Sequence, residues 1–406
     1  MNKAKSHTRT RSVAICTYIL DMGGVSNIIL ELGNFLRANG YDVSIICTDR
    51  KGNWYDRIEQ EGFKGKYFNS KLYEWTPFGR ILLARRVGRY MRKQAFDFII
   101  NNHSFYIHAA AGYFFDRSRI IHVVNNMLEQ MVERESDPLS DMIVGVSPYI
   151  EDLARQHLSA RMVTCILNAV KLPGESALEY EQCTDRPKDL LYVGRIDNRQ
   201  KAVFLIPDII QYLIDRDIRT GITVVGDGPD YEELKQMVKD RSLSDFIRFT
   251  GSVDAEKVSA YYASHKILLL PSNFEGHPLT LMEAMAHGCV PVVSLLPRCT
   301  DICVEQGKNG ILVGVGEVKD FGHGIWELLS DGALLNNMSK KALEEARNRF
   351  SVAIAHQQYL DLMKSLEGEK MERGKFPLIN RKYLSWKEMV PFQLVMFVKR
   401  KILKSL

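Results

Sequence analysis

The sequence has 406 residues, of which 46% are hydrophobic and 25% are charged, and its formal net charge is +5. This length exceeds one ordinary hydrophobic core and predicts a globular protein with two domains of about 150 to 200 residues each. The mild positive charge and the 10% of aromatic residues are not typical of general nucleic-acid binding, so we expect no nucleic acid as a partner.

The cysteines and the apolar runs bear on the compartment. The seven cysteines show no paired spacing, and the nearest two, Cys299 and Cys303, have no second ligand pair nearby. No secretory signal opens the sequence, so we expect a reducing cytosol. The longest apolar candidate, MVPFQLVMFV at 389–398, is too short for a membrane-spanning helix, which needs about 18 apolar residues.

The first part of the chain alternates short β-branched runs with helical stretches. This alternation is typical of a doubly wound parallel sheet. The predicted strands are VAICT (13–17), DVSIICT (42–48), FDFIINN (96–102), RIIHVV (119–124) and MIVGVS (142–147).

A second alternating series follows a stretch without periodicity at 171–187, which we interpret as a linker. We therefore predict an α/β fold of two Rossmann-like domains whose parallel sheets face a central cleft. The predicted strands of the second domain are LLYVG (190–194), ITVVG (222–226), FIRFTG (246–251), KILLLP (266–271) and VPVVS (290–294).

Ligands of such sheets bind at the carboxyl ends of the strands, so the loops that follow the strands are the candidate sites. In YILDMGGVSN, Gly23 and Gly24 precede a predicted helix, where open backbone N–H groups suit a phosphate. The same glycine pair also fits a simple tight turn.

Two further loops follow strands of the second domain. In VGRIDNRQKAVFLI, Arg195 and Lys201 are either a clamp for a pyrophosphate or two solvated charges. The loop VVGDGPDYEEL has Gly226 and Gly228 but no third glycine, so it lacks the dinucleotide-binding fingerprint and argues against a dehydrogenase.

The segment NFEGHPLTLMEAM places two carboxylates eight residues apart. Pro278 suits the first turn of a helix, so Glu275 is expected in the preceding loop and Glu283 about two turns into the helix. The two carboxylates and the helix start suit sugar hydroxyls and a phosphate. A capping carboxylate followed by an exposed helix glutamate fits the same spacing.

Several segments, taken in order, resemble the retaining GT-B glycosyltransferases of family 4. The resemblance covers nearly the whole chain and places its E-x7-E motif on EGHPLTLME. It implies an acceptor-side domain at 1–170, a linker at 171–187, a nucleotide-sugar domain at 188–366 and a basic tail at 367–406 that crosses back to the first domain. The segments are the Gly23-Gly24 loop, VSPYIEDLARQ, ILNAV, VGRIDNRQK, VVGDGPDYEELK, FTGSVD, LLLPSNFEGHPLTLMEAMAHGCVPVVS and GKNGILV.

The resemblance also implies roles for individual residues. Glu275 would face the transferred sugar, and Glu283 would bind the nucleotide ribose. His122 would lie beside the reacting carbon, with His103 as a rival for that role. The remaining residues of the implied donor site are Gly23, Gly24, Arg195, Lys201, Val253, Gly276, His277, Pro278, Leu279 and Thr280.

The chain departs from the family pattern in the segment LLPRCTDICVEQ after VPVVS and in the loop after His103. Both differences bear on which sugar and which acceptor are used. DRD at 215–217 looks like a metal-binding DxD pair, but it falls at a predicted helix end away from the expected cleft. We therefore expect no metal and no cofactor, with countercharge from Arg195, Lys201 and helix N-termini.

The resemblance implies transfer of a sugar from a nucleotide donor, a UDP-sugar above all, to a hydroxyl of a glycan or lipid-linked acceptor, with retention. We expect a setting in bacterial surface polysaccharide or lipopolysaccharide assembly. A nucleotide-sugar epimerase or hydrolase and a non-catalytic sensor remain alternatives. Basic residues at 80–93 and in the tail predict a cytoplasmic enzyme peripheral to an anionic membrane, although the tail's apolar residues would also suit burial on the first domain.

Overall fold

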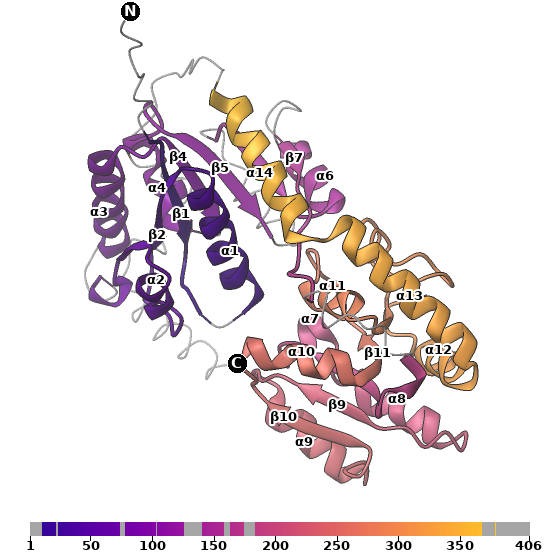
Figure 1. The fold of residues 1–406 in the computed structure, drawn as a ribbon. Helices are drawn as coiled ribbons and strands as arrows, with labels where there is room; N and C mark the ends of the chain where they lie inside the picture. Colours follow the sequence, from indigo (N-terminus) through magenta and orange to yellow (C-terminus); the bar gives the residue numbers. More distant parts are fainter. Residues whose placement is uncertain are drawn as a thin grey trace, which may run out of the picture. The chain divides into compact units, whose positions relative to one another are not determined.

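The computed structural model groups the chain into two compact units, each built on its own parallel sheet (Figure 1). Unit 1 comprises Met1–Gly145, Ile150–Cys165 and His356–Leu406, and unit 2 comprises Val146–Tyr149 and Ile166–Ala355. The residues that the structure describes are 10–21, 23–73, 78–102, 104–125, 140–157, 163–173, 183–367 and 378.

Unit 1 contains a seven-stranded sheet in the order β3-β2-β1-β4-β5-β6-β7. The direction of winding reverses between β1 and β4, which makes this point the topological switch of a doubly wound sheet. The strands are β1 (Ser12–Thr17), β2 (Asp42–Cys47), β3 (Lys64–Tyr67), β4 (Phe98–Asn102), β5 (Arg119–Val124), β6 (Met142–Gly145) and β7 (Val163–Cys165).

The longer helices α1 and α3 of unit 1 bury one face each, whereas the short α4 is buried almost all round. Helix α3, for example, buries Leu83, Val87 and Met91 at helical spacing, while its arginines stay outside. The helices named here are α1 (Gly24–Ala38), α2 (Asp56–Gln60), α3 (Gly79–Gln94), α4 (Phe105–Ala110) and α6 (Pro148–His157).

Unit 2 contains a six-stranded sheet in the order β10-β9-β8-β11-β12-β13, with its switch point between β8 and β11. Strands β8, β9, β11 and β12 are mainly buried and hydrophobic, whereas the edge strand β10 is partly exposed and carries Arg248 and Thr250. The strands are β8 (Lys188–Val193), β9 (Ile222–Val225), β10 (Ile247–Gly251), β11 (His265–Leu270), β12 (Val290–Ser294) and β13 (Ile311–Val313).

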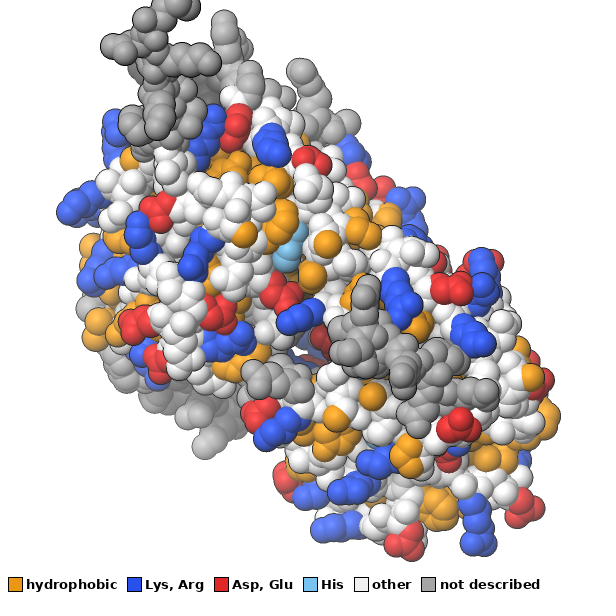
Figure 2. All heavy atoms as spheres, in the orientation of Figure 1, with side chains coloured by type: hydrophobic (Ala, Val, Ile, Leu, Met, Phe, Trp, Pro, Cys, Tyr) orange, Lys and Arg blue, Asp and Glu red, His pale blue; other side chains and the backbone are white. Residues whose placement is uncertain are grey.

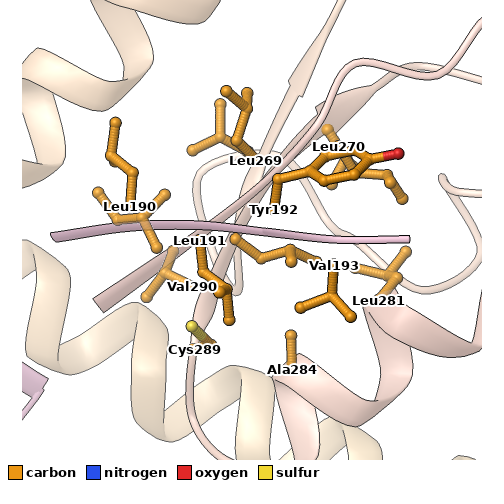
Figure 3. Close-up of a cluster of buried hydrophobic side chains, with 14 of the residues drawn as sticks. Leu190, Leu191, Tyr192, Val193, Leu269, Leu270, Leu281, Ala284, Cys289 and Val290 are labelled. Atoms are coloured by element: carbon orange, nitrogen blue, oxygen red, sulfur yellow. The ribbon is translucent and has the colours of Figure 1, made fainter. Parts of the chain in front are cut away.

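Strand β8 shows how the core of unit 2 is filled from both sides. Figure 3 shows Leu190 and Tyr192 on one side of the strand and Leu191 and Val193 on the other, the side of helix α11. The helices of unit 2 are α7 (Asn198–Lys201), α8 (Leu205–Ile214), α9 (Tyr231–Asp240), α10 (Ala255–Ser264), α11 (Leu279–Ala286), α12 (Val318–Ser330) and α13 (Gly332–Arg349). Helix α14 (Val352–Glu367) begins in unit 2, and its residues from His356 on belong to unit 1.

The ten predicted strands all lie on observed strands, with ends that differ by at most two residues. The sequence did not reveal β3, β7 and β13. Each of these is only three or four residues long, and β3 (KGKY) is mostly exposed and has no hydrophobic run. Periodicity gives no signal for such short strands.

The units and the predicted domains are not the same sets of residues. His356–Leu406 groups with unit 1, so the return to that unit begins within α14 rather than at 367. The ring of His356 lies 5.0 Å from that of Phe35, and Glu367 pairs with Arg11. The predicted basic tail itself lies outside the described residues, apart from Glu367 and Leu378.

Arg186, at the end of the predicted linker, is buried in unit 2. Its guanidinium donates to the carbonyl oxygens of His265 at 2.7 Å and His287 at 2.5 Å, and to that of Tyr262 at 3.3 Å. These carbonyls lie at the C-terminal ends of α10 and α11, where a cation is favoured by the helix dipole. One side chain therefore holds two helix ends together.

We expect Arg186→Met to lower the stability of unit 2, because the carbonyls at two helix ends lose a shared charged donor. The cost should be about 3 kcal/mol, which corresponds to a Tm about 6 to 12 °C lower in scanning calorimetry. Arg219→Met, at an exposed arginine of the same unit, is the matched control and should change stability by less than about 0.5 kcal/mol. Equal melting of the two variants would contradict the role given to Arg186.

Candidate active site

Lys201 and Glu275 form a buried ion pair at the switch point of unit 2. Lys201 ends α7, which follows β8, and Glu275 lies in the loop after β11. The Nζ of Lys201 is 2.5 Å from Oε1 of Glu275, and the two side chains are only 12% and 5% exposed. Ser272 donates to the same carboxylate oxygen at 2.7 Å, and Gln200 lies 3.5 Å from the other. The two predicted site residues are thus in direct contact, and their charges offset each other.

Arg195 differs from Lys201 in its environment. Its side chain is 66% exposed, and its nearest carboxylate, that of Asp197, is 3.8 Å away. Asp197 instead accepts from the N–H of Gln200 and begins α7 as its N-cap. Of the two cations predicted to clamp a diphosphate, Arg195 is therefore the one whose charge is open to a ligand.

Gly226 and Gly228, in the loop after β9, allow this loop to pack closely against another one. A Cβ on Gly226 would lie 1.9 Å from the carbonyl oxygen of Gly194, and one on Gly228 would lie 2.2 Å from that of Ile196. The loop after β9 must therefore approach the loop after β8 closely, and only glycine permits this approach.

Helix α11 starts beside Glu275. Pro278 occupies the N-cap position, one residue before the first helical turn predicted for it, where its missing N–H costs nothing. No side chain caps the helix, so Glu275 is not a capping carboxylate. The hydroxyl oxygen Oγ1 of Thr280 is buried without a hydrogen-bond partner among the described residues. The start of α11 thus offers unused backbone and side-chain donors.

The side chain of His277 points into unit 2. Its Nε2 lies 3.2 Å from the thiol of Cys303, and burial lowers its pKa to about 3. The thiol of Cys299 lies 3.4 Å from the carbonyl oxygens of both Glu275 and Gly276. Through these two cysteines, the unusual segment LLPRCTDICVEQ packs against the loop that carries Glu275. Nothing in the sequence around Cys299 and Cys303 predicted these contacts.

Glu283 lies in the middle of α11 and is half-buried, so it is not the exposed helix glutamate that the spacing also allowed. Its Oε2 accepts from the hydroxyl of Tyr262 at 2.8 Å. Burial raises the pKa of Glu283, and the Tyr262 hydrogen bond opposes that rise. Tyr262 is a buried core residue that the sequence analysis missed, because a tyrosine in a helix carries no distinguishing pattern.

The remaining predicted residues of the donor site lie on several different elements. Val253 is half-buried beyond the end of β10 and packs against the core of unit 2. Gly23 and Gly24 begin α1 in unit 1, and Gly23 has open space around it. Leu279 is half-buried in the first turn of α11. Asp215 and Asp217 of the DRD segment are exposed at the end of α8.

His122 lies on β5 of unit 1 and is 1% exposed. Its Nδ1 is 2.9 Å from the side-chain amide nitrogen of Asn101 on β4, and its ring stacks on that of His108 with 3.9 Å between centroids. Burial and the neighbouring His108 hold the pKa of His122 well below its usual value, so the ring is neutral. The rival His103 lies outside the described residues.

Two family models match the chain in succession. Residues 22–172 match the model described as Glycosyltransferase Family 4, and residues 187–331 match the one described as Glycosyl transferases group 1. An uncharacterized glycosyltransferase of Haemophilus influenzae is 25% identical over 79% of this chain and 90% of its own length. A lipopolysaccharide 1,6-galactosyltransferase of Salmonella typhimurium is 28% identical over 48% of this chain and 55% of its own length.

Solved structures agree on the fold. Anabaena HepE in complex with UDP-glucose superposes with a TM-score of 0.72 at 16% identity, covering 87% of this chain and 99% of that one. Staphylococcus aureus TarM gives a TM-score of 0.70 at 12% identity, covering 87% and 98%. The predicted GT-B fold with two Rossmann-like parallel sheets is therefore confirmed.

The described residues contain no group of three His, Cys, Asp or Glu side chains arranged to hold a metal ion. Within the same residues, no helix is long and apolar enough to cross a membrane.

The interaction between Lys201 and Glu275 can be measured by a double-mutant cycle on the free energy of unfolding. Lys201→Met should destabilise the protein by about 3 to 5 kcal/mol, because it leaves a buried carboxylate without its cation. In Lys201→Met with Glu275→Gln, neither charge remains, so the combined loss should be clearly smaller than the sum of the single losses. Additive losses in urea unfolding would show that the two charges do not interact.

Proposed function

Because the chain belongs to the GT-B glycosyltransferases of family 4, we propose that it transfers a sugar from a nucleotide-sugar donor, a UDP-sugar, to a hydroxyl acceptor with retention at the anomeric carbon. The observation that carries this proposal is the buried Lys201–Glu275 pair beside the uncapped start of α11. The pair holds a carboxylate suited to sugar hydroxyls next to backbone donors suited to a phosphate.

We assign the binding of the nucleotide-sugar donor to unit 2. Arg195 and the N–H groups of Leu279 and Thr280 would bind the diphosphate, with Lys201 adding charge while it holds Glu275. Glu283, oriented by Tyr262, would accept hydrogen bonds from the ribose hydroxyls. Val253 would contact the base, and Gly24 of unit 1 would offer an amide to the phosphates. Gly23, Gly276, His277 and Pro278 would shape the loops around the donor.

The proposed chemical step uses these groups. The bond between the anomeric carbon and the diphosphate oxygen breaks, and the electron pair leaves with the diphosphate, whose growing charge Arg195 and Lys201 stabilise. The acceptor oxygen bonds to the anomeric carbon on the same face, and its proton passes to the departing phosphate oxygen. His122 would hydrogen-bond the sugar, and no covalent enzyme nucleophile, metal or cofactor is invoked.

The acceptor is proposed to be a glycan or lipid-linked saccharide in bacterial surface polysaccharide or lipopolysaccharide assembly. One relative is a lipopolysaccharide 1,6-galactosyltransferase, although the match spans about half of its length. Helix α3 adds an exposed basic face of Arg85, Arg86, Arg89 and Arg92. Along the margin of unit 1 where Figure 1 labels α3, blue Lys and Arg side chains alternate with orange hydrophobic ones in Figure 2. This surface suits a cytoplasmic protein on an anionic membrane.

The donor assignment is tested by calorimetric titration with UDP, a panel of UDP-sugars and uridine. Arg195→Met should weaken UDP binding by about 1.5 to 3 kcal/mol and leave uridine binding nearly unchanged, whereas Glu283→Ala should weaken both. Lys239→Met, at an exposed lysine of α9, is the matched control. Equal UDP affinity of Arg195→Met and the native protein would refute the clamp.

Products from the donor distinguish the alternatives. With the donor alone, an epimerase would form an epimer and a hydrolase would release free sugar quickly. A sensor would bind the donor and form no product with any acceptor. A glycoside with the α or β configuration of the donor retained is the expected outcome, read by NMR of the product's anomeric proton.

The membrane assignment is tested by cosedimentation with vesicles. Binding should require anionic lipid, weaken with salt, and fall when Arg85, Arg89 and Arg92 become glutamine, each being worth about 1 kcal/mol near the surface. The control replaces three exposed cations of unit 2, namely Arg216, Arg219 and Lys239, and loses the same charge. If both triple variants bind equally, α3 is not the docking surface.

A further inference from the structure

Asn101 and His122 are partners across the neighbouring strands β4 and β5 of unit 1. Asn101 on β4 lies opposite His122 on β5 in the parallel register, which directs both side chains to the same face of the sheet. Both residues are 1% exposed. Their contact joins the side-chain nitrogen Nδ2 of Asn101 to the ring nitrogen Nδ1 of His122 at 2.9 Å.

The orientation of the Asn101 amide is fixed by Ser104. The backbone N–H of Ser104 donates to Oδ1 of Asn101 at 3.1 Å, and Nδ2 of Asn101 donates to the carbonyl oxygen of Ser104 at 3.2 Å. Turning the amide over would set two donors against each other and two acceptors against each other. Ser104 is itself held, because its hydroxyl lies 2.5 Å from that of Thr48 and accepts from the N–H of Ile107.

This orientation decides which ring nitrogen of His122 carries the proton. An amide nitrogen only donates, so Nδ1 of His122 must accept. A neutral ring that accepts at Nδ1 carries its hydrogen on Nε2. The Nε2 atom is buried and has no hydrogen-bond partner among the described residues. A buried donor without a partner is costly, so a ligand that supplies an acceptor there is favoured.

We infer that Asn101 is a positioning residue that locks His122 as the Nε2–H tautomer, so that His122 offers a hydrogen-bond donor to an oxygen atom of a bound sugar and does not act as a general base. The stacked ring of His108 supports this state, because two imidazolium rings 3.9 Å apart would repel. The choice of a sugar as ligand rests on the proposed function, whereas the tautomer follows from the contacts within unit 1.

The test is NMR of the full-length protein with 15N-labelled histidine. The 15N shifts and the couplings to ring carbon protons distinguish a protonated ring nitrogen from an unprotonated one. The His122 signals are identified by their loss in His122→Gln. We expect the native protein to show Nε2 protonated and Nδ1 unprotonated throughout the neutral range. A protonated Nδ1, or a doubly protonated ring at neutral pH, would overturn the inference without any variant at Asn101.

The second part of the test replaces Asn101, the hydrogen-bond partner of His122. In Asn101→Asp, the carboxylate only accepts, so the proton of His122 should move to Nδ1. Asn102→Asp makes the same substitution one residue along β4, where the native side chain accepts from Asn125, and should leave the His122 tautomer unchanged. An unchanged tautomer in Asn101→Asp, or the same change in both variants, would refute the role of Asn101. Melting curves show whether each variant is folded.

Turnover separates this inference from the proposed function. Removing one preorganised donor costs about 100-fold or more in kcat, so Asn101→Asp should lower kcat by that factor with the KM for the donor nearly kept. If the tautomers are as expected but no sugar is transferred by the native protein, the proposed function fails and the tautomer lock stands. If the native protein transfers sugar although Nδ1 of His122 is protonated, the tautomer inference fails and the proposed function stands.

Discussion

The organisation of unit 2 depends on one buried ion pair between Lys201 and Glu275. Burying either charge alone would cost several kcal/mol, so the end of α7 and the loop after β11 must stay in contact. A backbone hydrogen bond from Asn273 to Gln200 and the hydroxyl of Ser272 reinforce this contact. The pair therefore fixes where Glu275 lies relative to the start of α11, and it leaves the exposed Arg195 without such a partner.

Helix α11 is held along its whole length by polar contacts to the rest of unit 2. Before its start, His277 meets Cys303, and in its middle Glu283 accepts from Tyr262. At its end, the carbonyl oxygen of His287 accepts from Arg186. Because the buried apolar side of the helix is fixed as well, the free N–H groups at its start are preorganised. A ligand that binds there spends little free energy on ordering the protein.

The sequence predicted the long, well-patterned features and missed those that depend on tertiary contact. Buried β-branched runs identified ten of the thirteen described strands, and the segment EGHPLTLME predicted Glu275 and Glu283 as carboxylates of one site. The spacing could not show that Lys201 neutralises Glu275, since these residues are far apart in the chain. Asn101 was detectable in principle, because two asparagines end the hydrophobic run FDFIINN. Tyr262, Cys299 and Cys303 carried no comparable signal.

The strand ends that carry the candidate site residues differ in chemistry between the two units. In unit 2 the loops after β8 and β11 carry charge, on Arg195, Lys201 and Glu275, and a charged diphosphate matches such groups. In unit 1 the described groups at the ends of β4 and β5 are neutral, and the pKa of His122 is held low by burial. A neutral, dry set of donors and acceptors discriminates by hydrogen-bond geometry, because an unpaired polar group there is penalised. That environment suits a hydroxyl-bearing sugar and disfavours a phosphate.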